Sequence, residues 1–231
     1  MPQTMRVVAK TKGLELKAQA DQAELYIYGD IVTDKWFDED VSAASFVKDL
    51  KETEASQLDV FINSGGGSVF DGVTIYNALK RHSAHVNVHI DGLAASIASV
   101  IAMAGDTVSI AENAMLMIHD PWTVTMGNTS ALRKTADNLD TVRDSMLSSY
   151  KRSNLSEEEL MAAMEVETWY SGPEAVEHGF ADEVTGAIDI AASVKVPGDR
   201  FAHTPEQYLL QEGTPMPAAC LLYTSPSPRD S

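Results

Sequence analysis

Apolar positions recur with two different periods along the first half of the chain. Alternation of apolar with polar residues predicts strands over residues 23–31, 58–64 and 85–90. Apolar residues at helical spacing predict helices over residues 41–52, 68–82 and 96–105. Strands and helices therefore alternate, and this order favours an α/β fold with a parallel sheet.

The second half of the chain adds two short strands and a long polar helix. Residues 107–111 and 114–119 are short apolar runs that predict strands. Residues 129–153 have helical spacing with few apolar positions. A long helix with so thin an apolar stripe packs either on its own domain or against another chain, and the pattern leaves both open.

Two shorter helices follow, and each has recognisable end signals. Ser156 and Glu159 have the spacing of a capping box, which marks the start of a helix. Pro173 near the start and Gly179 at the stop delimit a helix over residues 172–179.

The periodic region sets the domain boundaries that we predict. We expect an N-terminal arm over residues 1–22, which are polar with weak periodicity, and one folded domain over residues 23–185. We expect residues 186–231 to be a disordered tail. Within it, residues 219–231 alternate Ser and Pro without a core face, and we interpret them as an artefact with no functional weight.

Composition and charge exclude several classes of function. The chain has 231 residues and a net charge of −17, from 34 acidic and 17 basic residues. So acidic a surface argues against nucleic-acid binding. No apolar run approaches the roughly 20 residues of a membrane span, and the N-terminus lacks a signal-peptide pattern, so we expect a cytoplasmic protein. The single cysteine, Cys220, can form neither an internal disulfide nor a thiolate metal cluster.

A run of small residues around one serine is the first candidate for chemistry. In "DGLAASIAS", residues 91–99, Ser96 stands where a predicted strand passes into a predicted helix. The small residues allow either tight packing of a buried helix start or close approach of a substrate to Ser96. If Ser96 is a nucleophile, the N–H of Ile97 in the first helical turn could bind an oxyanion.

A glycine loop is the second candidate. Residues 63–69, "NSGGGSV", join a predicted strand to a predicted helix and expose backbone N–H groups. A phosphate loop is excluded because no Gly-Lys-Ser/Thr follows, and the spacing differs from a dinucleotide fingerprint. A tight connection, a second oxyanion donor and a rail for an extended peptide remain open.

One histidine and one glutamate complete the candidates. His119 ends an apolar strand and is followed by Asp120 and Pro121. Both catalytic groups and structural histidines occur at such strand ends. Glu167 precedes Thr-Trp-Tyr, where a partly buried carboxylate could orient an imidazole, although a surface acid is equally compatible. We expect no metal site, because His85 and His89 share a strand without a third ligand nearby.

Taken in order, these stretches resemble the Clp protease proteolytic subunit family (ClpP), which are serine peptidases on the crotonase-like fold. The resemblance runs from about residue 23 to residue 184. It rests on four stretches: "INSGGGSVFDGVTIYNAL", "GLAASIAS", "MLMIHDP" and "SGPEAVEHGFAD". The order Ser, His, acid is also the order of that family.

The resemblance implies roles for individual residues. It makes Ser96 the nucleophile, His119 the general base, and the N–H groups of Gly67 and Ile97 the oxyanion hole. The third member of the triad falls on Glu167, where the family has Asp, and Asp120 is a weaker alternative.

The resemblance also implies substrate contacts, partners and assembly. Gly66, Ser68 and Pro121 would contact a peptide substrate. No cofactor and no metal is implied. The family has a protruding "handle" helix where this chain has residues 129–153, so we expect a homo-oligomer of stacked rings. The stretches "AELYIYGDI", "GLAASIASVIAMAGD" and "ETWYSGPEA" look closer to ClpP-related phage proteases of prohead maturation, whose substrate would be capsid or scaffold protein.

Four alternatives stay open on the sequence. The protein could be a housekeeping Clp subunit that works with an ATPase ring. It could be a crotonase-fold acyl-CoA enzyme, which needs no Ser–His pair. A Ser–Lys dyad would need Lys80, Lys134 or Lys151. An inactive assembly subunit would explain the Glu at position 167.

Overall fold

A computed structural model describes residues 6–11, 14–19, 21–34, 40–188, 196 and 200–209. The chain divides into two compact units, Met1–Val194 and Lys195–Ser231. In the second unit, the described residues contain the short 3₁₀ helix η2 (Glu206–Tyr208) and a parallel bridge between Val196 and Leu209. The first unit contains every candidate site residue.

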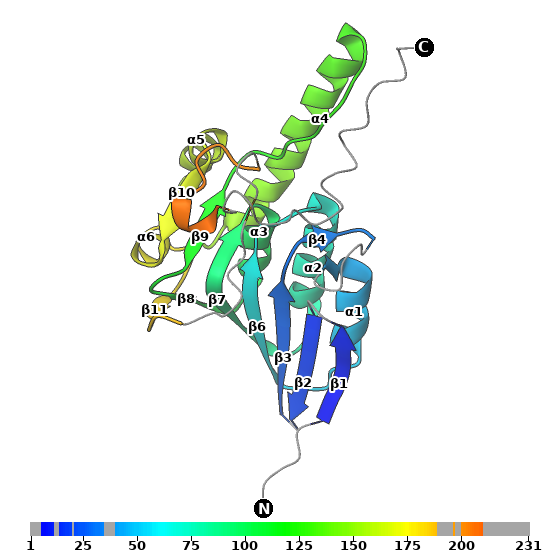
Figure 1. Ribbon diagram of the computed structural model, residues 1–231, viewed down its shortest axis with the longest axis vertical. Helices are drawn as coiled ribbons and strands as arrows, with labels where there is room; N and C mark the ends of the chain where they lie inside the picture. Colours follow the sequence, from blue (N-terminus) through cyan, green and yellow to red (C-terminus); the bar gives the residue numbers. More distant parts are fainter. Residues whose placement is uncertain are drawn as a thin grey trace, which may run out of the picture. The chain divides into compact units, whose positions relative to one another are not determined.

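The first unit is built on one large, mostly parallel sheet (Figure 1). Its strands are β1 (Arg6–Thr11), β2 (Leu14–Gln19), β3 (Gln22–Tyr28), β6 (Gln57–Ser64), β7 (His85–Ala95), β8 (Thr107–Ala111), β9 (Met115–Ile118), β10 (Thr168–Ser171) and β11 (Glu183–Thr185). The order is β1-β2-β3-β6-β7-β8-β11, and β9 pairs with both β7 and β10. The pairs from β3 to β11 and the β7–β9 pair are parallel, whereas β1–β2, β2–β3 and β9–β10 are antiparallel. The predicted parallel sheet is confirmed.

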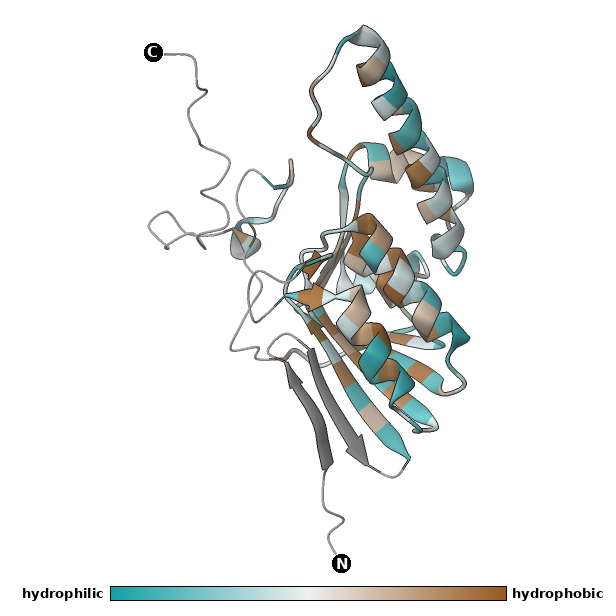
Figure 2. Cartoon of the chain, turned by 90° about the vertical axis from the view of Figure 1, so that its right-hand side faces the viewer, coloured by the Kyte–Doolittle hydropathy of each residue, from teal (hydrophilic) through white to brown (hydrophobic). Residues whose placement is uncertain are grey.

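The described part of this unit also contains six α-helices. They are α1 (Ala43–Lys51), α2 (Val69–Arg81), α3 (Ile97–Ala102), α4 (Thr129–Leu147), α5 (Glu157–Glu165) and α6 (Gly172–Glu177), with a 3₁₀ turn η1 (Ser148–Tyr150) after α4. Buried residues alternate with partly exposed ones along β3 and β6, and Figure 2 shows this alternation as bands along the strands. Helix α3 is buried along its whole length, as its all-round apolar sequence predicts.

Helix α4 extends away from the sheet (Figures 1 and 2). Its buried residues are Met146 and Leu147, at its C-terminal end. The loop before it and its first turns carry exposed apolar side chains: Trp122, Val124, Met126 and Leu132. The predicted long helix is confirmed, but it ends at Leu147 because the chain tightens into η1.

The predicted elements and the structure differ at several strands. Strand β7 continues past Ile90 to Ala95, because its last residues pair with β9 and are buried on both faces, which removes the alternation. Strands β1 and β2 lie in the segment interpreted as an arm, where the sequence showed no strand pattern. The small sheet of β4 (Ile31–Val32) and β5 (Val41–Ser42) was also not predicted. The tail residues 219–231 lie outside the described residues.

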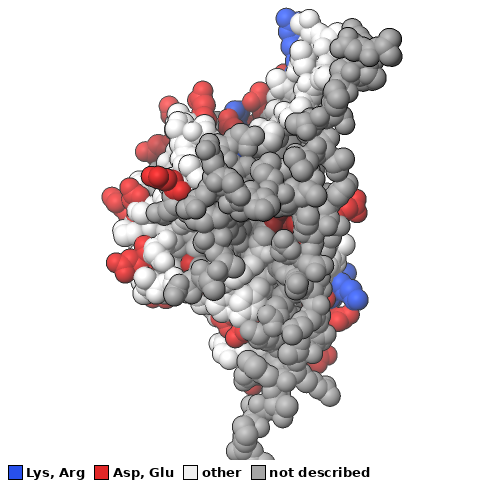
Figure 3. All heavy atoms as spheres, in the orientation of Figure 1, with Lys and Arg blue, Asp and Glu red and all other residues white. Residues whose placement is uncertain are grey.

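Acidic side chains are distributed over the visible surface, with few basic ones among them (Figure 3). Among the described residues, none of the helices combines the length and apolarity that crossing a bilayer requires.

Candidate active site

Ser96 occupies a strained turn between β7 and α3. Its φ of 56° and ψ of −130° lie outside the regions that residues with a Cβ atom prefer. Such conformations cost about 1–3 kcal/mol and persist where the surroundings hold them in place. The backbone N–H of Ser96 donates to Met117 O at 3.0 Å, which ties the turn to β9.

The small residues around Ser96 serve close packing of two backbones. Gly66 has a φ of +88°, and a Cβ atom placed on it would lie 2.7 Å from both Ala95 O and Ser96 Cβ. The glycine loop therefore lies directly against the serine turn. The structure therefore shows the tight packing that the small residues predict, and close approach of a substrate to Ser96 stays a prediction.

His119 meets Ser96 because two strands end side by side. Ala95 at the end of β7 pairs with Met117 in β9, and His119 follows β9 directly. Its Nε2 lies 2.8 Å from Ser96 Oγ, and its side chain is buried. An imidazole at this distance can accept the hydroxyl proton.

Glu167 is the turn residue that directly precedes β10. Thr168 pairs with Ile118 at the end of the antiparallel β9–β10 ladder, so Glu167 and His119 are the residues that flank this last pair. Glu167 is half-buried, has a φ of 54°, and its Oε1 accepts a hydrogen bond from Trp169 Nε1 at 3.1 Å.

Asp120, the weaker alternative for the acid, is engaged with helix α4. Its Oδ2 lies 3.8 Å from Arg143 Nη1. Burial raises the pKa of the Asp120 carboxyl, and the positive charge of Arg143 opposes this shift. The sequence analysis missed Arg143, because a basic residue on a polar helix carries no signal of its partner.

The two predicted oxyanion donors flank the same turn. Gly66 O accepts a bond from Ile31 N at 2.9 Å, and Ser68 N donates to Ile31 O at 2.7 Å, so the loop is fastened to β4. Because a peptide group is planar and trans, the N–H of Gly67 points away from Ile31, opposite to Gly66 O. The N–H of Ile97 belongs to the first turn of α3, where backbone donors lack helical acceptors.

The predicted substrate contacts differ in their exposure and in the hydrogen bonds that they make within the protein. Both backbone groups of Gly66 are bonded within the protein, its N–H to Ser64 Oγ at 3.1 Å. Ser68 is the N-cap of α2, and its hydroxyl donates to Asp71 Oδ2 at 2.5 Å. Gly67 is exposed and Pro121 half-exposed.

The structure bears on two further alternatives, a metal site and a Ser–Lys dyad. Among the described residues, no three His, Cys, Asp or Glu side chains gather as a metal site would require. Lys80 Nζ donates to Ala104 O at 3.4 Å, beyond the end of α3 that is opposite Ser96.

A serine hydroxyl bonded to a buried histidine, on a strand-to-helix turn beside a glycine loop, is the arrangement of serine hydrolases. Comparison with known proteins narrows this class. The sequence model of the Clp protease family matches residues 15–187, and the chain belongs to that family.

Three relatives carry the name ATP-dependent Clp protease proteolytic subunit. The Deinococcus radiodurans protein is 33% identical over 131 residues, which cover 55% of this chain and 64% of the relative. For Bacteroides fragilis the identity is 32% over 130 residues, with 55% and 63% covered. For Streptococcus pneumoniae it is 31% over 161 residues, with 63% and 79% covered. The chain thus spans less than two thirds of the Deinococcus and Bacteroides relatives.

Proposed function

We propose that the protein is a serine endopeptidase with a crotonase-like fold and a Ser96–His119–Glu167 triad. The observation that carries this proposal is the 2.8 Å hydrogen bond between Ser96 Oγ and His119 Nε2. An acyl-CoA enzyme of the same fold would not need that pair.

The reaction follows an acyl-enzyme route. His119 takes the hydroxyl proton as Ser96 Oγ attacks the peptide carbonyl carbon, and the oxyanion is bound by the N–H groups of Gly67 and Ile97. His119 then donates the proton to the leaving amine as the C–N bond breaks. Water, deprotonated by His119, hydrolyses the ester and restores Ser96. Glu167 orients the imidazole and stabilises its charged form.

Glu167 can fill the place of the family's Asp because of where its backbone lies. Its φ of 54° turns the chain just before β10, and the bond from Trp169 Nε1 holds one carboxylate oxygen. We propose that its other carboxylate oxygen accepts a hydrogen bond from His119 Nδ1.

Labelling with a fluorophosphonate probe, read by intact mass, tests this function. We expect wild type to be labelled, Ser96→Ala and His119→Ala to lose labelling, and Glu167→Gln to react about 10³- to 10⁴-fold more slowly. The matched control is His85→Ala, a histidine whose side chain is half-exposed on the same strand as Ala95. A folded wild-type protein that is not labelled would overturn the proposal.

We further propose that the enzyme forms a homo-oligomer through α4 and the loop before it. The support is a group of exposed apolar side chains, whose contact with water is unfavourable. They belong to Trp122, Val124, Met126 and Leu132. Stacked rings would place the active sites in a shared chamber.

The natural substrate that we propose is a phage capsid or scaffold protein in the host cytoplasm, cleaved without nucleic acid, membrane or cofactor. Its support is the likeness of three stretches to phage prohead proteases. The names of the relatives suggest the alternative, a subunit that acts with an ATPase ring. Cleavage of an unfolded protein without nucleotide or ATPase favours the phage role, whereas cleavage that needs the ATPase refutes it.

A further inference from the structure

Two buried hydroxyl groups lie beneath the nucleophile turn, outside the triad. Ser99 in α3 and Tyr150 in η1 are fully buried. Ser99 Oγ donates to Ser96 O at 2.6 Å, and Ser99 Oγ and Tyr150 OH are 2.8 Å apart. The sequence analysis singled out neither residue, because a lone hydroxyl in an apolar helix and a lone tyrosine carry no signal of their partners.

The direction of the two bonds follows from proton count. A serine hydroxyl carries one proton, and the proton of Ser99 is committed to Ser96 O. The Tyr150 hydroxyl must therefore be the donor to Ser99 Oγ. Burial raises the pKa of Tyr150 above its ordinary value, so the phenol keeps its proton across the working range of a peptidase.

The carbonyl that accepts these hydrogen bonds, Ser96 C=O, shares its peptide group with the proposed oxyanion donor, the N–H of Ile97. Ser96 C=O and Ile97 N–H are part of one planar unit and point in opposite directions. Fixing the carbonyl oxygen fixes the direction of the N–H. Ser99 N also donates to Ser96 O at 3.0 Å, so the oxygen is held by two donors from the same residue.

We propose that Ser99 and Tyr150 are positioning residues that hold the Ser96–Ile97 peptide so that its N–H points at the oxyanion. The inference rests on the proposed peptidase function and deepens it. Two features of the turn call for such a clamp. Ser96 is in a strained conformation that its own preferences do not maintain, and an oxyanion donor works only when it is aimed before the reaction. Donation to the carbonyl also polarises the peptide and strengthens its N–H as a donor.

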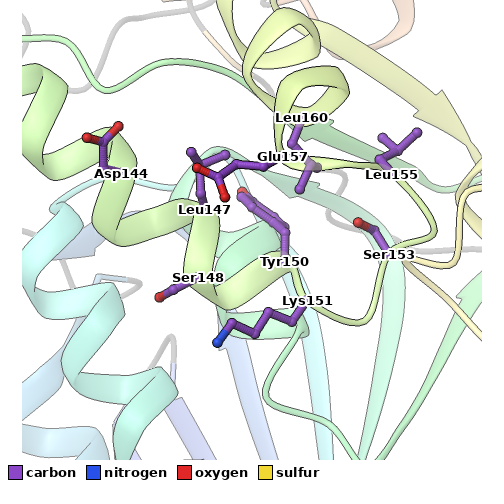
Figure 4. A pocket seen from close by; sticks show the side chains of 9 residues that line it. All are labelled: Asp144, Leu147, Ser148, Tyr150, Lys151, Ser153, Leu155, Glu157 and Leu160. Carbon is purple, nitrogen blue, oxygen red and sulfur yellow. The ribbon is translucent and has the colours of Figure 1, made fainter.

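Tyr150 connects this pair of positioning residues to the C-terminal end of α4. It follows α4 in η1, its ring meets Phe180 edge-on with centroids 6.0 Å apart, and it lines a pocket with Leu147 and Leu160 (Figure 4). A movement of the last turn of α4 would therefore shift the Tyr150 hydroxyl, which donates to Ser99 Oγ.

The test uses single-atom deletions in the full chain. For Tyr150→Phe and for Ser99→Ala, we expect the rate of fluorophosphonate labelling and the kcat for a peptide substrate to fall about tenfold, a fraction of what the loss of a whole oxyanion donor causes. KM should stay unchanged, because substrate binding precedes the demand for the donor. The double variant should react no more slowly than Ser99→Ala, because Tyr150 acts only through Ser99.

Tyr170→Phe is the matched control. Tyr170 is buried, and its ring packs on the same Phe180 with centroids 5.0 Å apart, so its variant loses a hydroxyl in a similar environment. It should react at the wild-type rate. A general loss of packing would instead slow the control as well, raise KM, or lower the melting temperature in parallel with the rate.

The possible failures can be told apart. If wild type reacts and Tyr150→Phe and Ser99→Ala react equally fast, the positioning role is wrong while the peptidase function stands. If folded wild type does not react at all, both fall together. Additive losses in the double variant would show that Tyr150 acts independently of Ser99 and would overturn the relay.

Discussion

At the scale of single residues, backbone strain coincides with the candidate chemistry. Among the described residues, Ser96 and Glu167 are the two non-glycine residues with positive φ. Strained conformations of this kind concentrate at functional sites, where neighbours hold them against their own preference. The glycine loop belongs to the same group, because Gly66 and Gly67 also have positive φ and lie beside the serine turn.

Gly66→Ala should disturb the proposed nucleophile, Ser96, without unfolding the domain. The new Cβ would lie 2.7 Å from Ser96 Cβ on a backbone that disfavours side chains, so the loop and the turn must separate. We expect fluorophosphonate labelling to slow at least about tenfold and stability to fall by about 1–3 kcal/mol. Gly186→Ala is the control, since a Cβ there meets nothing within 4 Å. Equal labelling rates in the two variants would contradict the close approach.

At the scale of elements, the site depends on how α2 and α3 meet. Gly72 in α2 faces Ile97, the first residue of α3, so closely that a Cβ on Gly72 would lie 2.1 Å from Ile97 Cγ1. Ile97 also carries one of the two proposed oxyanion N–H groups. Packing between two helices therefore sets the position of a proposed oxyanion donor.

Gly72→Ala should move α3 and weaken catalysis from a distance. Overpacking at a helix contact costs about 1–3 kcal/mol. We expect a lower melting temperature and a lower kcat for a peptide substrate. Asn77→Ala, on the exposed face of α2, should change neither. A variant that is destabilised while kcat is unchanged would separate packing from catalysis and refute this link.

Helices α5 and α6 both begin with capping boxes, which make their stability dependent on pH. Bonds from the side chain and backbone of Ser171 lower the pKa of Glu174 below its ordinary 4.5, and Ser156 does the same for Glu159. A lowered folded-state pKa adds stability above about pH 4.5 that is lost as pH falls through the folded value. The melting temperature of wild type should therefore exceed that of Glu174→Gln at neutral pH, and the gap should shrink as the pH falls below about 4.5. A gap that is constant with pH would contradict the role of the carboxylate.

At the scale of the whole molecule, the exposed apolar side chains before and within α4 call for a partner. Met126 is 94% exposed and Val124 76% exposed, on a segment that leaves the body of the domain. A second copy of the chain is the partner that we propose.

Met126→Asp combined with Val124→Asp should shift the protein to smaller species in size-exclusion chromatography with light scattering. A charge in a buried contact is strongly unfavourable, whereas the isolated domain loses nothing from it. Val166→Asp, 62% exposed at the end of α5, should leave the assembly unchanged. If both proteins elute as wild type does, α4 and its loop are not the contact.

Much of the fold could be predicted because its signals are local. The strand at 58–64 and the helix at 68–82 follow from the spacing of neighbouring apolar residues, and the capping box at Ser156 is read from two positions. Strands β1 and β2 could not be predicted in this way, because a polar edge segment becomes a strand only when another strand offers it hydrogen bonds.

The sequence by itself determined the order of the helices and of the central strands, and the residues that could carry chemistry, since periodicity, caps and residue types act over a few positions. Only the tertiary structure decided which of them meet. Ser96 and His119 are 23 positions apart, and Ser99 and Tyr150 are 51 apart. The register of β7 on β9 and of β9 on β10, and the contact between η1 and α3, bring these residues together. Register and packing are properties of the folded chain as a whole, because each pairing is stable only once the others have formed.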